Sequence, residues 1–134
     1  MPTTKIETPL ADPLFEREVA KQLSFWWRRQ GVGFDHVLTR FAELSGDRVF
    51  SGPFPLGGSG AQTGEPGSQL FALVTCVVSR ERDHAFRRSY ALAVRALLAT
   101  RIPADRIFVS FDPVDPADHF TPGTAWAEPS EENQ

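Results

Sequence analysis

Several features that define large classes of protein are missing from this sequence of 134 residues. It has one cysteine, Cys76, which excludes a disulfide bond within the chain and fits a cytoplasmic protein. Because Cys76 lies in an apolar run, we expect a buried and unreactive thiol. No apolar run reaches about 18 residues, so we expect no membrane span. The start of the sequence lacks the basic and apolar regions of a signal peptide.

An excess of positive charge is also missing. The chain has 14 Lys and Arg against 17 Asp and Glu, a net charge of −3, which argues against a nucleic-acid-binding surface. His84 and His119 have no Cys, Asp or Glu at metal-ligand spacing on a shared element, so we expect no metal. A Gly- and Pro-rich stretch, residues 52–68, lacks the Lys-Ser/Thr ending of a phosphate-binding loop. We therefore expect the protein to use no cofactor. We interpret this stretch as a flexible connection, or alternatively as a lid that covers a pocket with Phe54 and Leu56.

What is present is a strand–helix–strand pattern that occurs twice. In the first unit, the alternating residues 3–8 predict a strand, and Asp12 and Pro13 are residue types typical of an N-cap and a first helical position. Apolar residues at helical spacing follow until Gly31, and a second strand is expected over residues 36–43.

The second unit repeats this order. Residues 70–78 form a nearly continuous apolar run, typical of a strand that is buried on both faces. Asp83 is a candidate N-cap for a helix that Pro103 closes, and residues 106–111 predict the last long strand.

Together the two units predict one α/β (α+β) domain over residues 1–123. Units 2–50 and 69–111, joined by the Gly/Pro-rich connection, give two parallel strand pairs in one four-stranded mixed sheet, with both helices on one face. No third helical segment is available to cover the other face, so we expect partner subunits there. Residues 124–134 are expected to form a flexible tail.

The second residue, Pro2, is a candidate for chemistry. Removal of Met1 would make it the first residue, and its secondary amine can act as a base or nucleophile. A free α-amino group titrates near pH ~8, and burial or a neighbouring cation lowers its pKa further. Many chains begin with Met-Pro, so the interpretation depends on the strand directly behind Pro2 and on two arginines in mid-chain, Arg80 and Arg82.

Three short segments carry a resemblance to a known family. Residues 88–109 resemble the second helix and following strand of macrophage migration inhibitory factor. Residues 41–52, FAELSGDRVFSG, resemble the Phe-x-Glu, turn and Val-Phe-x-Gly pattern of cis-chloroacrylic acid dehalogenase, and residues 79–82, SRER, resemble the Ser-Arg-x-Arg of malonate semialdehyde decarboxylase. The three segments occur in one chain with a single β-α-β-β-α-β order of elements. By this combination the chain resembles the tautomerase superfamily over about residues 2–123. That superfamily also includes the 4-oxalocrotonate tautomerase-like enzymes. The resemblance implies a homotrimer whose sheets wrap a central barrel.

The resemblance also implies an enzyme, an isomerase or lyase, that acts on a small carbonyl carboxylate. Neutral Pro2 would take a proton from the carbon next to the carbonyl of a 2-oxo acid, giving keto–enol tautomerisation. Alternatively, protonated Pro2 would polarise the carbonyl of a 3-oxo acid and promote decarboxylation, or the amine would form a Schiff base. Two further alternatives stay open: a non-catalytic trimeric binding module with the same fold, and a hydratase like the cis-dehalogenase. Ser110 and Thr121 stand where the dehalogenase pattern has Tyr and Glu, which disfavours the hydratase.

Three side chains are candidates for supporting roles. If the strand before them continues that far, Arg80 and Arg82 point to one face and can bind a substrate carboxylate; the alternative is a solvated run of charge. Asp35 stands near the position where the decarboxylase has an aspartate that assists its proline, which implies proton transfer or water activation. The alternative for Asp35 is a turn residue at the entry of a strand.

Overall fold

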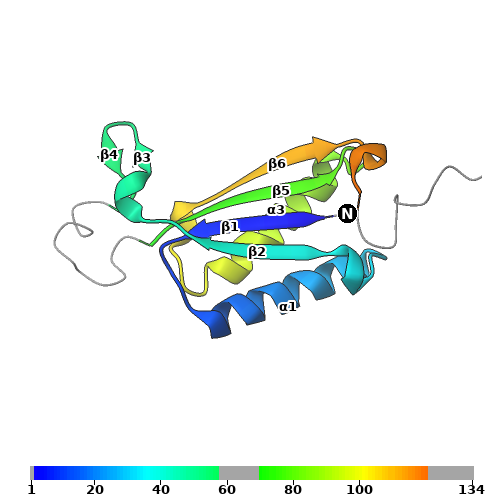
Figure 1. Cartoon of the computed structure of the whole chain (residues 1–134), viewed down its shortest axis with the longest axis horizontal. Coiled ribbons are helices and arrows are strands. Elements are labelled where there is room, and N and C mark those ends of the chain that lie inside the picture. The colour runs from blue at the N-terminus through cyan, green and yellow to red at the C-terminus, as the bar shows by residue number, and fades with distance from the viewer. Residues whose placement is uncertain (1, 58–69, 121–134) are drawn as a thin grey trace, which may run out of the picture.

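The computed structural model describes residues 2–57 and 70–120 (Figure 1). One sheet of four strands is covered on one face by two helices. The strands are β1 (Thr3–Thr8), β2 (Leu38–Glu43), β5 (Ala72–Ser79) and β6 (Ile107–Val114), and the helices are α1 (Pro13–Arg29) and α3 (His84–Leu98). The order is β2-β1-β5-β6, with β1–β2 and β5–β6 parallel and β1–β5 antiparallel. The predicted mixed sheet with both helices on one face is therefore confirmed.

Both helices are capped at their N-termini by the aspartates that the sequence analysis identifies, Asp12 and Asp83. The Asp12 carboxylate accepts hydrogen bonds from the N–H groups of Leu14 (3.1 Å) and Phe15 (3.3 Å). The Asp83 carboxylate accepts one from the N–H of Phe86 at 2.9 Å. Each cap satisfies N–H groups that have no partner within the helix, so both predicted N-caps are confirmed.

Several element boundaries differ from those predicted. The second strand begins at Leu38 rather than residue 36, because residues Phe34–His36 form a 3-10 turn in which His36 N–H donates to the Gly33 carbonyl at 3.0 Å. Helix α3 ends at Leu98, five residues before Pro103. The last strand runs on to Val114 because it stays paired with β5 along its whole length.

The connection after β2 contains a small hairpin that the sequence analysis misses. Strands β3 (Phe50–Ser51) and β4 (Phe54–Pro55) pair antiparallel around Gly52, whose φ of +58° is a conformation that favours glycine. Phe54 is 72% exposed and Leu56 is buried, so only Leu56 faces the interior. Residues 58–69 of the connection and the predicted tail lie outside the described residues, and the lid and domain limits stay predictions.

The core lies between the sheet and the two helices. Alternate residues of the strands point into it, and their burial follows the period of two that a pleated strand imposes. The fully buried side chains include Ile6, Leu23, Trp27, Val74, Tyr90 and Val94. In β5 the intervening residues are only half-buried in one chain, so the expectation of burial on both faces is not met within the chain.

Two buried threonines of β1 form hydrogen bonds, one to helix α3 and one to the residue before β5. The Thr4 hydroxyl and the Tyr90 hydroxyl of α3 are 2.6 Å apart, and the Thr8 hydroxyl donates to the Phe71 carbonyl at 2.6 Å. Burial raises the pKa of Tyr90 to about 12 and that of the neighbouring Cys76 thiol to about 12. Cys76 is fully buried and protonated at neutral pH, which confirms the prediction of a buried thiol.

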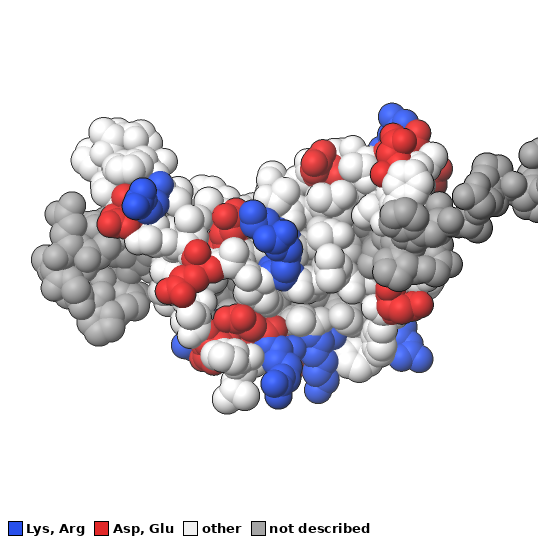
Figure 2. All heavy atoms as spheres, viewed as in Figure 1, with Lys and Arg blue, Asp and Glu red and all other residues white. Residues whose placement is uncertain are grey.

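The second face of the sheet has no helix of the described residues over it (Figure 1). By the strand register, Lys5, Glu7, Leu73, Val77 and Phe108 lie on this face. Figure 2 shows the molecule in the same view as Figure 1, with uncharged surface beside a few charged side chains. None of the helices in residues 2–57 and 70–120 is long and apolar enough to cross a membrane.

The hydrogen bond between Thr4 and Tyr90 gives a test of this packing. Tyr90→Phe leaves a buried hydroxyl without its main partner, so we expect the free energy of unfolding in urea to fall by about 1 kcal/mol. The double variant Thr4→Val/Tyr90→Phe removes both polar groups and should recover most of that loss. Equal stability of Tyr90→Phe and the unaltered protein would contradict the hydrogen bond.

Candidate functional site

Pro2 lies at the start of the central strand β1 and is buried. Its carbonyl accepts a hydrogen bond from the N–H of Leu38 at 3.0 Å. Thr3 pairs with Val77, so continuing the register by one residue brings Pro2 beside Val78. With Met1 in place the nitrogen of Pro2 is an amide. Its release as an amine therefore needs the removal of Met1.

The topology brings three loops to the same edge of the sheet as Pro2. Strands β1 and β2 begin at this edge, and β5 and β6 end there, because β1 and β5 are antiparallel while both outer pairs are parallel (Figure 1). The loops are the turn Phe34–His36 before β2, the turn from Arg80 after β5, and the turn Pro116–Asp118 after β6. Each of the candidate residues Asp35, Arg80 and Arg82 belongs to one of these loops.

Arg80 forms an ion pair with Asp115, a residue that the sequence analysis does not single out. The Nη2 of Arg80 donates to Oδ2 of Asp115 at 2.7 Å, and the N–H of Arg80 donates to the Val114 carbonyl at 2.8 Å. A hydrogen bond from the N–H of Ala117, and then the Arg80 guanidinium, lower the pKa of Asp115. The pair is open to solvent, with exposed fractions of 63% for Arg80 and 39% for Asp115.

Arg82 is in a different environment from Arg80. Strand β5 ends at Ser79, and Arg82 lies in the turn that follows, where its N–H donates to the Ser79 carbonyl at 3.0 Å. The condition for placing both arginines on one strand face is therefore not met. The guanidinium of Arg82 lies 4.6 Å from the ring centre of Phe86 and 5.7 Å from that of Trp27, within the range of cation–π contacts.

Asp35 and His36 occupy the turn before β2. Oδ2 of Asp35 lies 3.7 Å from Nε2 of His36, and the Asp35 side chain is 83% exposed while that of His36 is 32% exposed. The hydrogen bond between Leu38 and Pro2 keeps this turn next to the start of β1. Asp35 is thus a solvated carboxylate near Pro2 rather than a buried acid.

His119 is the residue that the sequence analysis undervalues, since it considers His119 only as a metal ligand. It follows the turn after β6, is half-buried, and its Nδ1 is buried without a hydrogen-bond partner in the described parts of the chain. Burial, and then the positive charge of the amino terminus, lower the pKa of His119 below its usual value. His119 thus follows β6 at the edge of the sheet where β1 begins, and its burial favours the neutral form of the imidazole. Nothing in the sequence predicts this burial, because it depends on the turn Pro116–Asp118 and on residues far from His119 in the chain.

Within residues 2–57 and 70–120, no three His, Cys, Asp or Glu side chains are close enough together to hold a metal ion.

Comparison with known proteins gives the fold its context. No family model matches the sequence, and no curated protein matches it either. Solved structures do match. A native fused 4-OT has a TM-score of 0.70 at 18% identity, covering 90% of this chain and 93% of its own. The macrophage migration inhibitory factor of Toxoplasma gondii has a TM-score of 0.67 at 17% identity, covering 90% of this chain and 96% of its own.

This chain has the tautomerase-superfamily fold. A fused 4-OT described as a symmetric trimer matches with a TM-score of 0.67 at 15% identity, over 90% of this chain and 92% of its own. At these identities the likeness concerns the tautomerase fold alone, and it confirms the resemblance predicted from the three sequence segments at that level.

The environment of Asp115 can be tested by titration. In Arg80→Gln, we expect the pKa of Asp115 to rise, because the carboxylate loses one of the two groups that stabilise its charge. It should stay below the ordinary value because the Ala117 N–H remains. The measurement is the pH dependence of the carboxyl carbon signal in NMR, with Arg82→Gln as the matched charge control. Equal shifts in the two variants would contradict the assigned pairing.

Proposed function

We propose that this protein is an enzyme that uses Pro2, released by removal of Met1, as acid and base on a small 2-oxo or 3-oxo carboxylate. The observation that carries the proposal is that Pro2 is buried at one edge of the sheet. The segments that follow β5 and β6 reach the same edge, and they contain Arg80, Arg82 and His119. The shared fold with macrophage migration inhibitory factor and 4-OT structures supports it.

Burial suits the amine for this role. A buried amine is disfavoured in its charged form, so Pro2 would be kept neutral and able to accept a proton from the carbon next to a carbonyl. The neutral imidazole of His119 can then accept a hydrogen bond from the prolinium N–H. Return of the proton at another atom of the substrate completes a tautomerisation. The alternative, decarboxylation of a 3-oxo acid, requires that Pro2 take its proton from solvent before the substrate binds, so that the prolinium can polarise the carbonyl; burial of the amine favours the first route.

The arginines supply the carboxylate binding. Exposed ion pairs contribute only about 0–1 kcal/mol, so Arg80 can exchange Asp115 for a substrate carboxylate at little cost. The guanidinium of Arg82 lies 4.6 Å from the ring centre of Phe86 and has no ion pair within the described residues, so its N–H groups are available to a carboxylate. Asp35, solvated and next to the start of β1, would pass protons to water or activate it.

We also propose that three chains assemble. The sheet face opposite the helices carries the apolar residues Leu73, Val77 and Phe108, which are half-buried or exposed in one chain. Trimers among the fused 4-OT structures support a homotrimer here.

The assembly is tested by mass in solution. Three chains of 14.9 kDa each should sediment as a particle of roughly 45 kDa. Leu73→Arg places a charge on the proposed interface and should give a folded monomer, whereas Arg29→Glu, on the exposed end of α1, should leave the trimer unchanged. A wild-type particle of 15 kDa would contradict the proposal.

Catalysis by Pro2 is tested with intact mass and kinetics together. We expect the purified native protein to lack Met1, and Pro2→Ala to lower the rate of enol-to-keto conversion of an aryl enolpyruvate by about 100-fold or more. Arg80→Ala should raise KM more than it lowers kcat. Retained Met1, or equal rates for Pro2→Ala and the unaltered protein, would favour the alternative of a non-catalytic trimeric module.

A further inference from the structure

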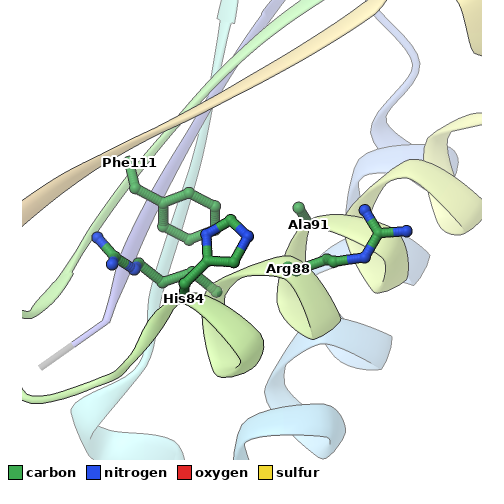
Figure 3. A pocket seen from close by; sticks show the side chains of 5 residues that line it. His84, Arg88, Ala91 and Phe111 are labelled. Carbon is green, nitrogen blue, oxygen red and sulfur yellow. The ribbon is translucent and has the colours of Figure 1, made fainter.

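A groove lies between helix α3 and the edge strand β6, on the helix side of the sheet (Figure 3). Its volume is about 300 Å³. In Figure 3 the ring of Phe111 comes from the strand, while His84, Arg88 and Ala91 come from one side of the helix. The lining residues are His84, Arg87, Arg88, Ala91 and Phe111.

The groove exists because α3 uses its other side for the core. Phe86 and Tyr90 pack their rings against Trp26 and Trp27 of α1, at centroid distances of 4.9–5.4 Å. Residues at positions 84, 87, 88 and 91 share the remaining side of the helix, since neighbours on a helix face are three or four apart. Among residues 2–57 and 70–120, no strand follows β6 in the sheet, so this side is left open at its edge in the described part of the chain.

The positive charge in the groove is not neutralised by its surroundings. In the described parts of the chain, the side chains of His84 and Arg88 make no hydrogen bond or ion pair. Arg87 uses one N–H on the main-chain carbonyl of Asp83, at 3.3 Å. The Asp83 carboxylate caps the helix through the Phe86 N–H. A protein with a net charge of −3 thus lines this groove with two arginines and a histidine.

The groove differs from the Pro2 edge in its place and in its chemistry. Phe111 pairs with Cys76 in the middle of β5, and β5 separates β6 from β1. Arg80 already has a carboxylate partner, whereas the side chain of Arg88 has no ion pair in the described residues. The groove also combines its cations with an apolar wall, Ala91 and Phe111.

These features define one class of ligand. Guanidinium groups match the planar carboxylate with paired hydrogen bonds, and the wall of Ala91 and Phe111 accepts an apolar or aromatic group. About 300 Å³ is the lower end of the range for small-molecule sites. We propose that this groove binds a small carboxylic acid carrying an aromatic or short apolar group, at a second site separate from Pro2.

The test is an NMR titration of the assembled protein with sodium benzoate. We expect saturable shifts of the amide signals of His84, Arg88 and Ala91, and weaker binding of acetate, which lacks the ring. Benzyl alcohol lacks the carboxylate and should not bind. No saturation by benzoate, or shifts confined to Leu38 and Val78 at the Pro2 edge, would overturn the proposal.

Variants separate the groove from the proposed catalysis. Arg88→Gln should weaken benzoate binding by about tenfold, the effect of losing a charge-assisted hydrogen bond. Arg29→Gln makes the same change of charge at an exposed site on α1 and should have no effect. Unchanged affinity in Arg88→Gln would overturn the proposal. Pro2→Ala should bind benzoate in the groove as the unaltered protein does, so failure of the catalytic role leaves this result interpretable.

Discussion

The antiparallel pairing of β1 with β5 is the constraint on which the rest of the structure depends. Each β-α-β unit alone makes only a parallel pair of strands. The Thr3–Val77 register joins the two pairs head to tail, so that the beginning of β1 meets the ends of β5 and β6. Residues far apart in the sequence, Pro2, Arg80 and His119, reach one edge of the sheet for this reason. A register shift of one residue would turn Thr4 and Ile6 away from the core.

The same strand fixes Pro2 in place. Two residues after Pro2, the Thr4 hydroxyl is held by Tyr90 inside the core, and the Pro2 carbonyl is held by Leu38 of β2. Buried hydrogen bonds of this kind are costly to break. The start of β1 is therefore anchored on the helix side and at its neighbouring strand. Such anchoring would serve the role that we propose for Pro2, since small displacements of a reacting atom reduce the rate of a reaction.

Sequence patterns predicted the parts of this molecule that local chemistry determines. Asp12 and Asp83 identify the helix starts because a capping carboxylate acts on residues next to it in the chain. The apolar run over residues 70–78 predicted the end of β5 to within one residue, but the further condition that the strand continue to Arg82 is not met, because the pairing stops at Ser79. The sequence also did not predict the buried position of His119, because that position depends on the turn after β6. The site is thus less predictable than the fold that carries it.

The arginines at the Pro2 edge and in the groove differ in whether a carboxylate of the protein already pairs with them. At the Pro2 edge, Arg80 is balanced by Asp115, and any carboxylate bound there under the proposed function must compete with that internal partner. In the groove beside α3, Arg88 faces no such competitor among the described residues, and the apolar wall adds contact area. Competition by an internal carboxylate lowers the affinity for an external one, which is compatible with the release of product in the proposed reaction. An unopposed cation has no such competitor, so it favours tighter binding of the carboxylate that we propose for the groove.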